Sequence, residues 1–145
     1  MTLQRGATLP SRTFGPISRT DIVRYQGASG DFNPIHHDEP FAQAAGFPTV
    51  FSVGMLQAGY LAAYCVDLLG PENVRRFRVR FHDQVWPGDV LTCSGSIADV
   101  EEPADGAGVL ISLDLRVERE PGDVVASGSA VFAAASVRTA ATSSA

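Results

Sequence analysis

The sequence predicts a single α+β domain in which one buried helix lies against an antiparallel β-sheet. Residues 53–69 are apolar almost without interruption, which is typical of a helix packed inside a protein. After Gly70 and Pro71 the pattern changes to alternating apolar and polar residues, as in half-buried strands. The strands most simply wrap the helix, because no second helix is long enough to cover the other side of the sheet.

Short elements are predicted before the buried helix. Residues 12–18 fit a short strand, and a helix of two or three turns follows, capped by Ser18 or Thr20 and stopped by residues 27–30. The polar stretch after that helix is predicted to be a loop. Residues 40–45 then form a short helical turn, because Gly46 and Pro48 end it.

Four stretches after the buried helix are predicted strands, because apolar and polar residues alternate in them or turn residues bound them. They are residues 76–81, 90–100, 111–118 and 124–133, with turns at residues 86–89 and 121–123. We expect residues 1–135 to form the domain and the small polar residues 136–145 to form a disordered tail.

Composition excludes several classes of function. A net charge of -5 argues against nucleic acid as a partner, since phosphate binding needs a basic face. All 11 basic residues are arginine, which excludes Schiff-base chemistry and a P-loop lysine. Cys65 and Cys93 lack CxxC spacing, so we expect reduced buried thiols in a cytoplasmic protein. The N-terminus shows no secretory signal, and the longest apolar run is short for a membrane span.

The stretch SGDFNPIHHDEPF (residues 29–41) holds two of the three histidines. Pro34 fixes its own φ and pushes Asn33 toward extended geometry, so this loop is stiffer than its polarity suggests. A stiff loop can hold the Asp31 carboxylate and the His36 imidazole on one site, where the pair can bind and deprotonate a water. Asn33 is suited to fix the carboxylate or the loop backbone.

Two other interpretations of this stretch stay open on spacing alone. Asp31 can cap the following turn while His36 is a satisfied polar residue at the end of a loop. His36, His37 and Asp38 are possible metal ligands, but adjacent residues rarely converge on one ion and no HExxH or facial-triad spacing occurs. We therefore do not expect a metal site.

Residues 25–36 (YQGASGDFNPIH) resemble the signature of MaoC-like (R)-specific enoyl-thioester hydratases, Gly-Asp-x-Asn-Pro-hydrophobic-His. The likeness continues through residues 37–42, 54–56, 77–81 and 85–89, and covers nearly the whole chain. The members that the chain resembles most have a single domain, and they include the dehydratase subunits of mycolic-acid-type fatty acid elongation. The resemblance implies a hot-dog fold, in which a long helix is wrapped by an antiparallel sheet. This agrees with the layout predicted from the pattern.

The resemblance also implies roles for individual residues. Asp31 and His36 match the catalytic pair, with Asn33 in support. Gly54 matches the residue whose backbone N–H binds the thioester carbonyl, a role that suits a helix N-terminus, although tight packing of the helix on the sheet explains a glycine equally well. Candidate substrate-pocket residues are Phe32, Ser52, Val53 and Met55.

One position departs from the family pattern. Many relatives have histidine where this chain has Val53, and we expect this change to affect substrate details more than activity. Three other features are interpreted as structural: His82 and Asp83 as exposed residues at a strand end, and residues 86–89 as a turn. Arg76, Arg78 and Arg80 are interpreted as a solvated strand face, with contact to phosphates of CoA or to an acidic carrier protein as the alternative.

The predicted function is the interconversion of a trans-2-enoyl thioester and an (R)-3-hydroxyacyl thioester of CoA or an acyl carrier protein. Asp31 is the expected base and His36 the water-orienting acid, and Gly54 would stabilise charge on the thioester oxygen. No cofactor is expected, because the thioester already acidifies C2. The alternatives are a non-catalytic or partner-dependent hot-dog subunit and a hot-dog thioesterase. We expect a homodimer or a heterodimer with a homologous subunit.

Overall fold

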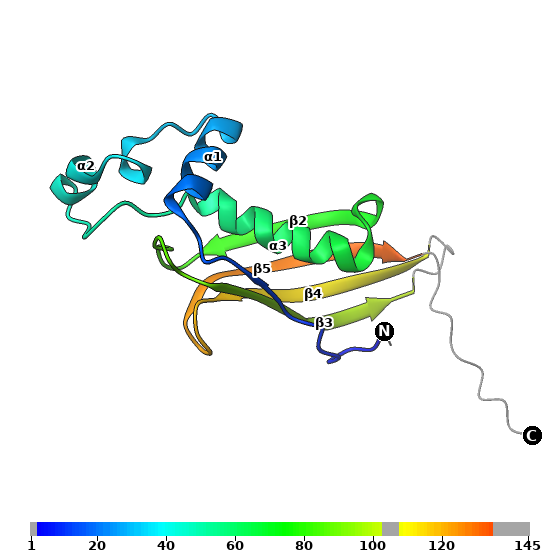
Figure 1. Ribbon diagram of the computed structural model, residues 1–145. Helices are drawn as coiled ribbons and strands as arrows, with labels where there is room; N and C mark the ends of the chain where they lie inside the picture. The colour runs from blue at the N-terminus through cyan, green and yellow to red at the C-terminus, as the bar shows by residue number, and fades with distance from the viewer. Residues whose placement is uncertain (1–2, 103–107, 135–145) are drawn as a thin grey trace, which may run out of the picture.

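The computed structural model describes residues 3–102 and 108–134 (Figure 1). A five-stranded sheet in the order β1-β3-β4-β5-β2 carries the long helix α3 (Gly54–Leu69) along one face, and each neighbouring pair of strands is antiparallel. This arrangement is the hot-dog fold and confirms the predicted α+β class. The tail predicted at residues 136–145 lies outside the described residues.

The strands follow the predicted pattern, with small differences at their ends. Their bounds are β1 Arg12–Phe14, β2 Val74–Phe81, β3 Leu91–Glu101, β4 Val109–Glu118 and β5 Val124–Ala134. β1 is shorter than predicted. Gly15 takes a positive φ of 108° and Pro16 has no N–H to donate, so ladder pairing with β3 stops at Phe14.

The core lies between α3 and the inner face of the sheet. In β4 the alternating residues Ile111, Leu113, Leu115 and Val117 are buried, and Leu61 packs with them from the helix. Full burial of each such side chain stabilises the fold by roughly 1.5–3 kcal/mol. The sheet and α3 therefore form a rigid platform for the segments at the N-terminal end of the helix.

Helix α3 is not enclosed on every side, contrary to the expectation from its apolar sequence. Leu61 and Cys65 are fully buried, whereas Met55, Gly59 and Asp67 are exposed. The reason is geometric, since the sheet of one chain covers one face of the helix only. The face of α3 that carries Met55, Gly59 and Asp67 is thus left open in the single chain.

Three short helices lie beside the N-terminal end of α3 (Figure 1). They are α1 (Arg19–Ser29), the 3₁₀ helix η1 (Pro34–His36) and α2 (Glu39–Ala44); a second 3₁₀ helix, η2 (Pro71–Asn73), precedes β2. As predicted, Ser18 caps α1, and it forms a capping box with Asp21. The helix passes through Gly27 and ends at Gly30, which takes the left-handed φ of 75°.

The two cysteines are free and buried in the core. Burial, and secondarily the neighbouring Cys93, raises the pKa of Cys65 to about 12, and burial raises the pKa of Cys93 to about 12. Both thiols are therefore protonated and unreactive at neutral pH. Across residues 3–102 and 108–134, no helix is long and apolar enough to cross a membrane.

Arg76, Arg78 and Arg80 are exposed on β2, as predicted for a solvated strand face. No carboxylate of the described residues lies within ion-pair distance of them. Contact with phosphates or an acidic carrier protein stays a prediction.

Candidate active site

The loop after α1 is ordered by its own polar side chains. Asp31 Oδ1 accepts the N–H of Asn33 at 3.2 Å, and Asn33 Oδ1 accepts the N–H of Ile35 at 3.1 Å. The second bond caps η1, with Pro34 as its first residue. The predicted loop therefore contains a 3₁₀ turn, which fixes the spacing between Asp31 and His36.

Gln26 ties this loop to α1 and was not recognised as a site residue from the sequence. Its buried side chain donates from Nε2 to the carbonyls of Asp31 (2.8 Å) and Asn33 (3.1 Å). Its Oε1 accepts a hydrogen bond from His37 Nδ1 at 3.0 Å. One amide thus fixes the backbone on both sides of Phe32.

His36 is buried, and a backbone carbonyl sets the tautomer of its neutral ring. Nδ1 lies 2.7 Å from the carbonyl oxygen of Phe51, and the ring meets the Phe51 ring edge to face with centroids 5.2 Å apart. Because a carbonyl can only accept, Nδ1 carries the proton. In the neutral ring, Nε2 therefore presents a lone pair.

That lone pair faces Asp31. His36 Nε2 and Asp31 Oδ2 are 3.9 Å apart, too far for a direct hydrogen bond and close enough for one water to reach both atoms. The Asp31 side chain is 44% exposed, so a substrate can approach its carboxylate. Two acceptors placed in this way would take both O–H groups of a single water and leave its lone pairs free.

The two other interpretations of the loop can be compared with this geometry. Asp31 does bind the backbone of the following turn, but through Oδ1, which leaves Oδ2 toward His36. Asp38 is the N-cap of α2 and accepts the N–H of Phe41. Within the described ranges, no group of three or more potential ligands is placed to hold a metal ion.

Gly54 opens α3 beside a cavity of about 330 Å³. Residues of the β2–β3 connection and the segment before α3 line this cavity, among them Phe51, Ser52, Phe81, Asp83 and Gln84. Asp31 and His36 do not line it, and they are linked to it through the Phe51 carbonyl. Among the hydrogen bonds between described residues, none uses the Gly54 N–H, as expected at the first position of a helix.

The packing explanation for Gly54 finds little support in the structure. A Cβ added at Gly54 would lie 3.4 Å from Phe81 Cε1, an ordinary van der Waals contact, and would not meet the sheet backbone. Packing of helix on sheet therefore does not require glycine here. The glycine instead leaves the N-terminus of α3 open toward the cavity.

The start of α3 is held by two buried polar side chains, Ser52 and Gln57. With its amide oriented to satisfy both ends, Gln57 donates to the carbonyls of Val53 (2.6 Å) and Gly54 (2.9 Å) and accepts from Ser52 Oγ (2.8 Å). The N–H of Ser52 donates to the carbonyl of Val85 at 2.8 Å. The sequence signal that pointed to Gln57 was its place as a polar residue within an otherwise apolar helix.

The candidate pocket residues lie in different surroundings. Ser52 lines the cavity with Gly54, whereas Val53 is buried in the hydrophobic core. Phe32 is 68% exposed and Met55 is 56% exposed in the single chain. The predicted substrate-pocket roles of all four residues stay predictions.

An ion pair holds α2 beside the loop. Arg19 Nη2 lies 2.6 Å from Glu39 Oε2, and Thr49 Oγ1 accepts from Arg19 and donates to Glu39. The hydrogen bond from Arg19, followed by that from Thr49, lowers the pKa of Glu39. Glu39 is therefore ionised at neutral pH, and the contact joins α1, α2 and the segment that leads to Ser52.

Replacement of Gln26 tests how strongly the loop depends on this amide. Gln26→Glu keeps the shape but cannot donate to the carbonyls of Asp31 and Asn33, so we expect about 1–3 kcal/mol less stability. Thermal unfolding measures this loss. Gln43→Glu makes the same chemical change at an exposed position of α2 and should stay within about 0.5 kcal/mol of wild type. Equal behaviour of the two variants would contradict the role of Gln26.

Comparison with known proteins identifies the class. A family model described as "MaoC like domain" matches residues 4–109, so the chain belongs to the MaoC-like dehydratase family. Members similar to this chain include (R)-specific enoyl-CoA hydratases and 3-hydroxyacyl-thioester dehydratases.

The chain is 35% identical over 83 residues to the (R)-specific enoyl-CoA hydratase of Rhodospirillum rubrum, covering 56% of this chain and 58% of the relative. Its match to the mouse peroxisomal multifunctional enzyme type 2 covers 13% of the length of that enzyme. The chain therefore spans less than two thirds of the length of each of these two relatives. Among solved structures, it superposes on R-hydratase PhaJ1 from Pseudomonas aeruginosa with a TM-score of 0.76 and 26% identity, covering 91% of this chain and 82% of that one. The ChsH1-ChsH2 complex from Mycobacterium tuberculosis gives a TM-score of 0.77 at 23% identity, covering 90% and 97%.

Proposed function

We propose that this protein hydrates trans-2-enoyl thioesters to (R)-3-hydroxyacyl thioesters and catalyses the reverse dehydration. The observation that carries the proposal is the 3.9 Å separation of Asp31 Oδ2 and His36 Nε2, with Nδ1 held by the Phe51 carbonyl. Membership of the MaoC-like family supports the reaction class and the stereochemistry. The N–H of Gly54, which no other described residue accepts, follows Phe51 by three residues and supports a thioester as the substrate.

In the proposed hydration, one water donates its two O–H groups to Asp31 Oδ2 and His36 Nε2. Its oxygen attacks C3 while Asp31 takes one proton, and the electron pair of the C2–C3 double bond moves toward the thioester carbonyl. Asp31 then returns the proton to C2, so that H and OH have been added across the bond. With its proton on Nδ1, neutral His36 orients the water by accepting from it, which differs from the acid role expected from the sequence.

Gly54 supplies the electrostatic part of the proposal. Negative charge that develops on the thioester oxygen would be stabilised by the Gly54 N–H and by the positive end of the α3 dipole. Gln57 and Ser52 hold this donor in place from the buried side. The acyl chain is proposed to lie in the cavity that Gly54 lines.

A direct assay separates the candidate functions. With crotonyl-CoA as substrate, the proposed hydratase removes the enoyl absorbance without releasing free thiol. A thioesterase would release thiol, and a non-catalytic subunit would do neither. If neither signal appears with the protein alone and the enoyl signal appears with an added homologous subunit, the partner-dependent alternative replaces the proposal.

The surface near the site leads to a prediction about assembly. Met55 and Phe81 expose large apolar side chains, and β2 ends the sheet without a partner strand on its outer side among the described residues. Such an edge and apolar surface favour association with a second hot-dog chain. We expect a homodimer, or a heterodimer of the kind named in the ChsH1-ChsH2 structure, by size-exclusion chromatography with light scattering at micromolar concentration. A stable, active monomer would contradict this.

A reducing compartment such as the cytoplasm is part of the proposal, supported by the two free buried thiols.

A further inference from the structure

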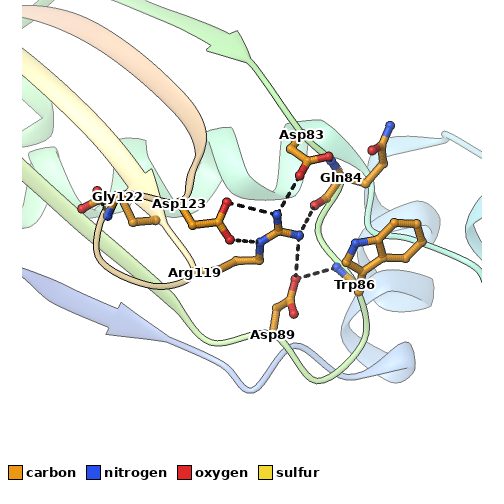
Figure 2. Close-up of polar contacts among 8 residues, drawn as sticks. Asp83, Gln84, Trp86, Asp89, Arg119, Gly122 and Asp123 are labelled. Atoms are coloured by element: carbon orange, nitrogen blue, oxygen red, sulfur yellow. Dashed lines mark hydrogen bonds and ion pairs between the residues drawn. The ribbon is translucent and has the colours of Figure 1, made fainter.

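Arg119 lies directly after β4 and makes polar contacts with three aspartates (Figure 2). Nη2 donates to Asp83 Oδ2 at 2.7 Å, and Nε donates to Asp123 Oδ2 at 2.7 Å. Nη1 donates to the carbonyl of Gln84 at 3.1 Å and lies 3.8 Å from Asp89 Oδ2. The Arg119 side chain is only 18% exposed, so these contacts are partly shielded from water.

The contacts of Arg119 reach both ends of the β2–β3 connection, residues 82–90. Asp83 and Gln84 bind it near the end of β2, and Asp89 lies beside it before β3. Asp89 also accepts the N–H of Trp86 at 2.8 Å (Figure 2). One guanidinium therefore holds the whole connection against the β4–β5 turn.

The β2–β3 connection contacts the two residues that lead to Gly54 and to His36, namely Ser52 and Phe51. The Val85 carbonyl accepts the N–H of Ser52, two residues before Gly54. The Trp86 ring packs edge on against the Phe51 ring, with centroids 5.8 Å apart, and the Phe51 carbonyl binds His36. A shift of this connection would therefore move two groups together: the Gly54 N–H, which is the proposed donor to the thioester oxygen, and the His36 imidazole.

Stability of the β4–β5 turn alone does not account for these contacts. The turn has its own backbone bonds, from Arg119 N–H to the Asp123 carbonyl and from Asp123 N–H to the Glu120 carbonyl. A guanidinium needed only for the turn would have no reason to bind Asp83 and the Gln84 carbonyl.

We infer that Arg119 is a positioning residue of the active site, which sets the cavity wall at residues 83–85 and, through it, the placement of Gly54 and His36. This inference rests on the proposed function for its catalytic consequence. Its structural consequence, the order of the β2–β3 connection, does not depend on the reaction.

The charges needed for this contact are present at neutral pH. The hydrogen bond with Asp123, together with the bond to Asp83, raises the pKa of Arg119 above its ordinary value although burial opposes this. The bond to Arg119 lowers the pKa of Asp123. The pair therefore stays charged under ordinary assay conditions.

Arg119→Met tests the inference, because methionine fills part of the volume but cannot bind the aspartates or the Gln84 carbonyl. For crotonyl-CoA hydration we expect kcat to fall on the order of 10- to 100-fold with little change in KM, since small misplacement of a donor affects the transition state most. The control is Ile111→Val, a buried truncation in β4 far from this turn, compared well below both melting temperatures. Equal kcat losses in the two variants would mean that Arg119 acts through stability alone.

Trp86 provides a readout that is independent of activity, because it is the single tryptophan of the chain and belongs to the clamped connection. We expect Arg119→Met to shift the native Trp86 emission and increase its quenching by acrylamide, with unchanged circular dichroism. Ile111→Val should keep the wild-type emission. Arg119→Lys, which retains the charge without the guanidinium fork, should show a smaller shift and a partial recovery of kcat, and it provides the test if the methionine variant fails to fold.

The outcomes separate the two proposals. Wild-type emission in both Arg119 variants would overturn the positioning role. If the wild-type protein does not hydrate crotonyl-CoA while the Trp86 changes occur as expected, the proposed function fails for that substrate and the structural role of Arg119 stands.

Discussion

Asp31→Asn should lower kcat for crotonyl-CoA hydration by about 10²–10⁴-fold, equivalent to roughly 3–5 kcal/mol of barrier. The amide keeps an oxygen that can accept the Asn33 N–H, so the turn at residues 31–33 is retained. What is lost is the proposed ability of Oδ2 to take a proton from a water bound between it and His36 Nε2, 3.9 Å away. The melting temperature should stay near that of wild type, because the Asp31 side chain is partly exposed and makes no buried contact that asparagine cannot make.

A control for charge is available in the same loop. Asp38→Asn removes one negative charge but keeps a good N-cap for α2, so its turnover should be close to wild type. If Asp31→Asn also retains activity within a few-fold of wild type, Asp31 is a structural cap and the catalytic assignment is wrong.

His36→Ala is expected to cause a loss of similar order to Asp31→Asn. The double variant should lose much less than the product of the two effects, because both side chains are proposed to act on one water. His36 is buried against Phe51, so its replacement also leaves a carbonyl without a partner and should lower the melting temperature, unlike Asp31→Asn. Multiplicative losses would show that the two residues act in separate steps.

The sheet and the main helix could be predicted because their patterns depend on neighbouring residues. Alternation from Ile111 to Val117 places one side of β4 in the core, and this is what the structure contains. Helix ends were harder to predict. Gly27 has open space around the position of a Cβ and a helical backbone, whereas Gly30 adopts a positive φ, and composition alone does not separate two such glycines.

The candidate site loop could be predicted for the same reason, since Asp31, Asn33 and His36 lie within one short stretch that local hydrogen bonds hold in shape. Arg119 could not, because its partner Asp83 is 36 residues away and pairing of charges across strands leaves no periodic trace. The contacts of Gln26 could not be predicted either, because its Nε2 binds backbone carbonyls, which every type of residue has.

The open face of α3 shows a further limit of prediction from one chain. An apolar helix is predicted to be buried, yet Met55 is exposed because the sheet of the single chain covers only one face of α3. The pattern records that the side chains are apolar and does not record which surface covers them, so coverage of this face by a second chain stays a prediction.

Gly54→Pro should reduce kcat by about 10²–10³-fold, the effect of removing one oxyanion donor. Proline lacks the N–H that is proposed to bind the thioester oxygen, and no hydrogen bond between described residues uses this N–H. The fold should tolerate the change. Proline is favoured at the first position of a helix, and Val53, with φ of -67° and ψ of 124°, already has the extended conformation required before proline. Circular dichroism and thermal unfolding should therefore resemble those of wild type.

Gly54→Ala separates loss of the donor from added bulk. Alanine keeps the N–H, and its Cβ would make an ordinary contact with Phe81 at 3.4 Å, so this variant should retain most of the activity and gain up to about 1 kcal/mol of stability from helix propensity. Activity that is high in the alanine variant and low in the proline variant assigns the function of Gly54 to its backbone N–H. Equal losses in the two variants would assign it to space in the cavity instead, because they share an added side chain and differ in the donor.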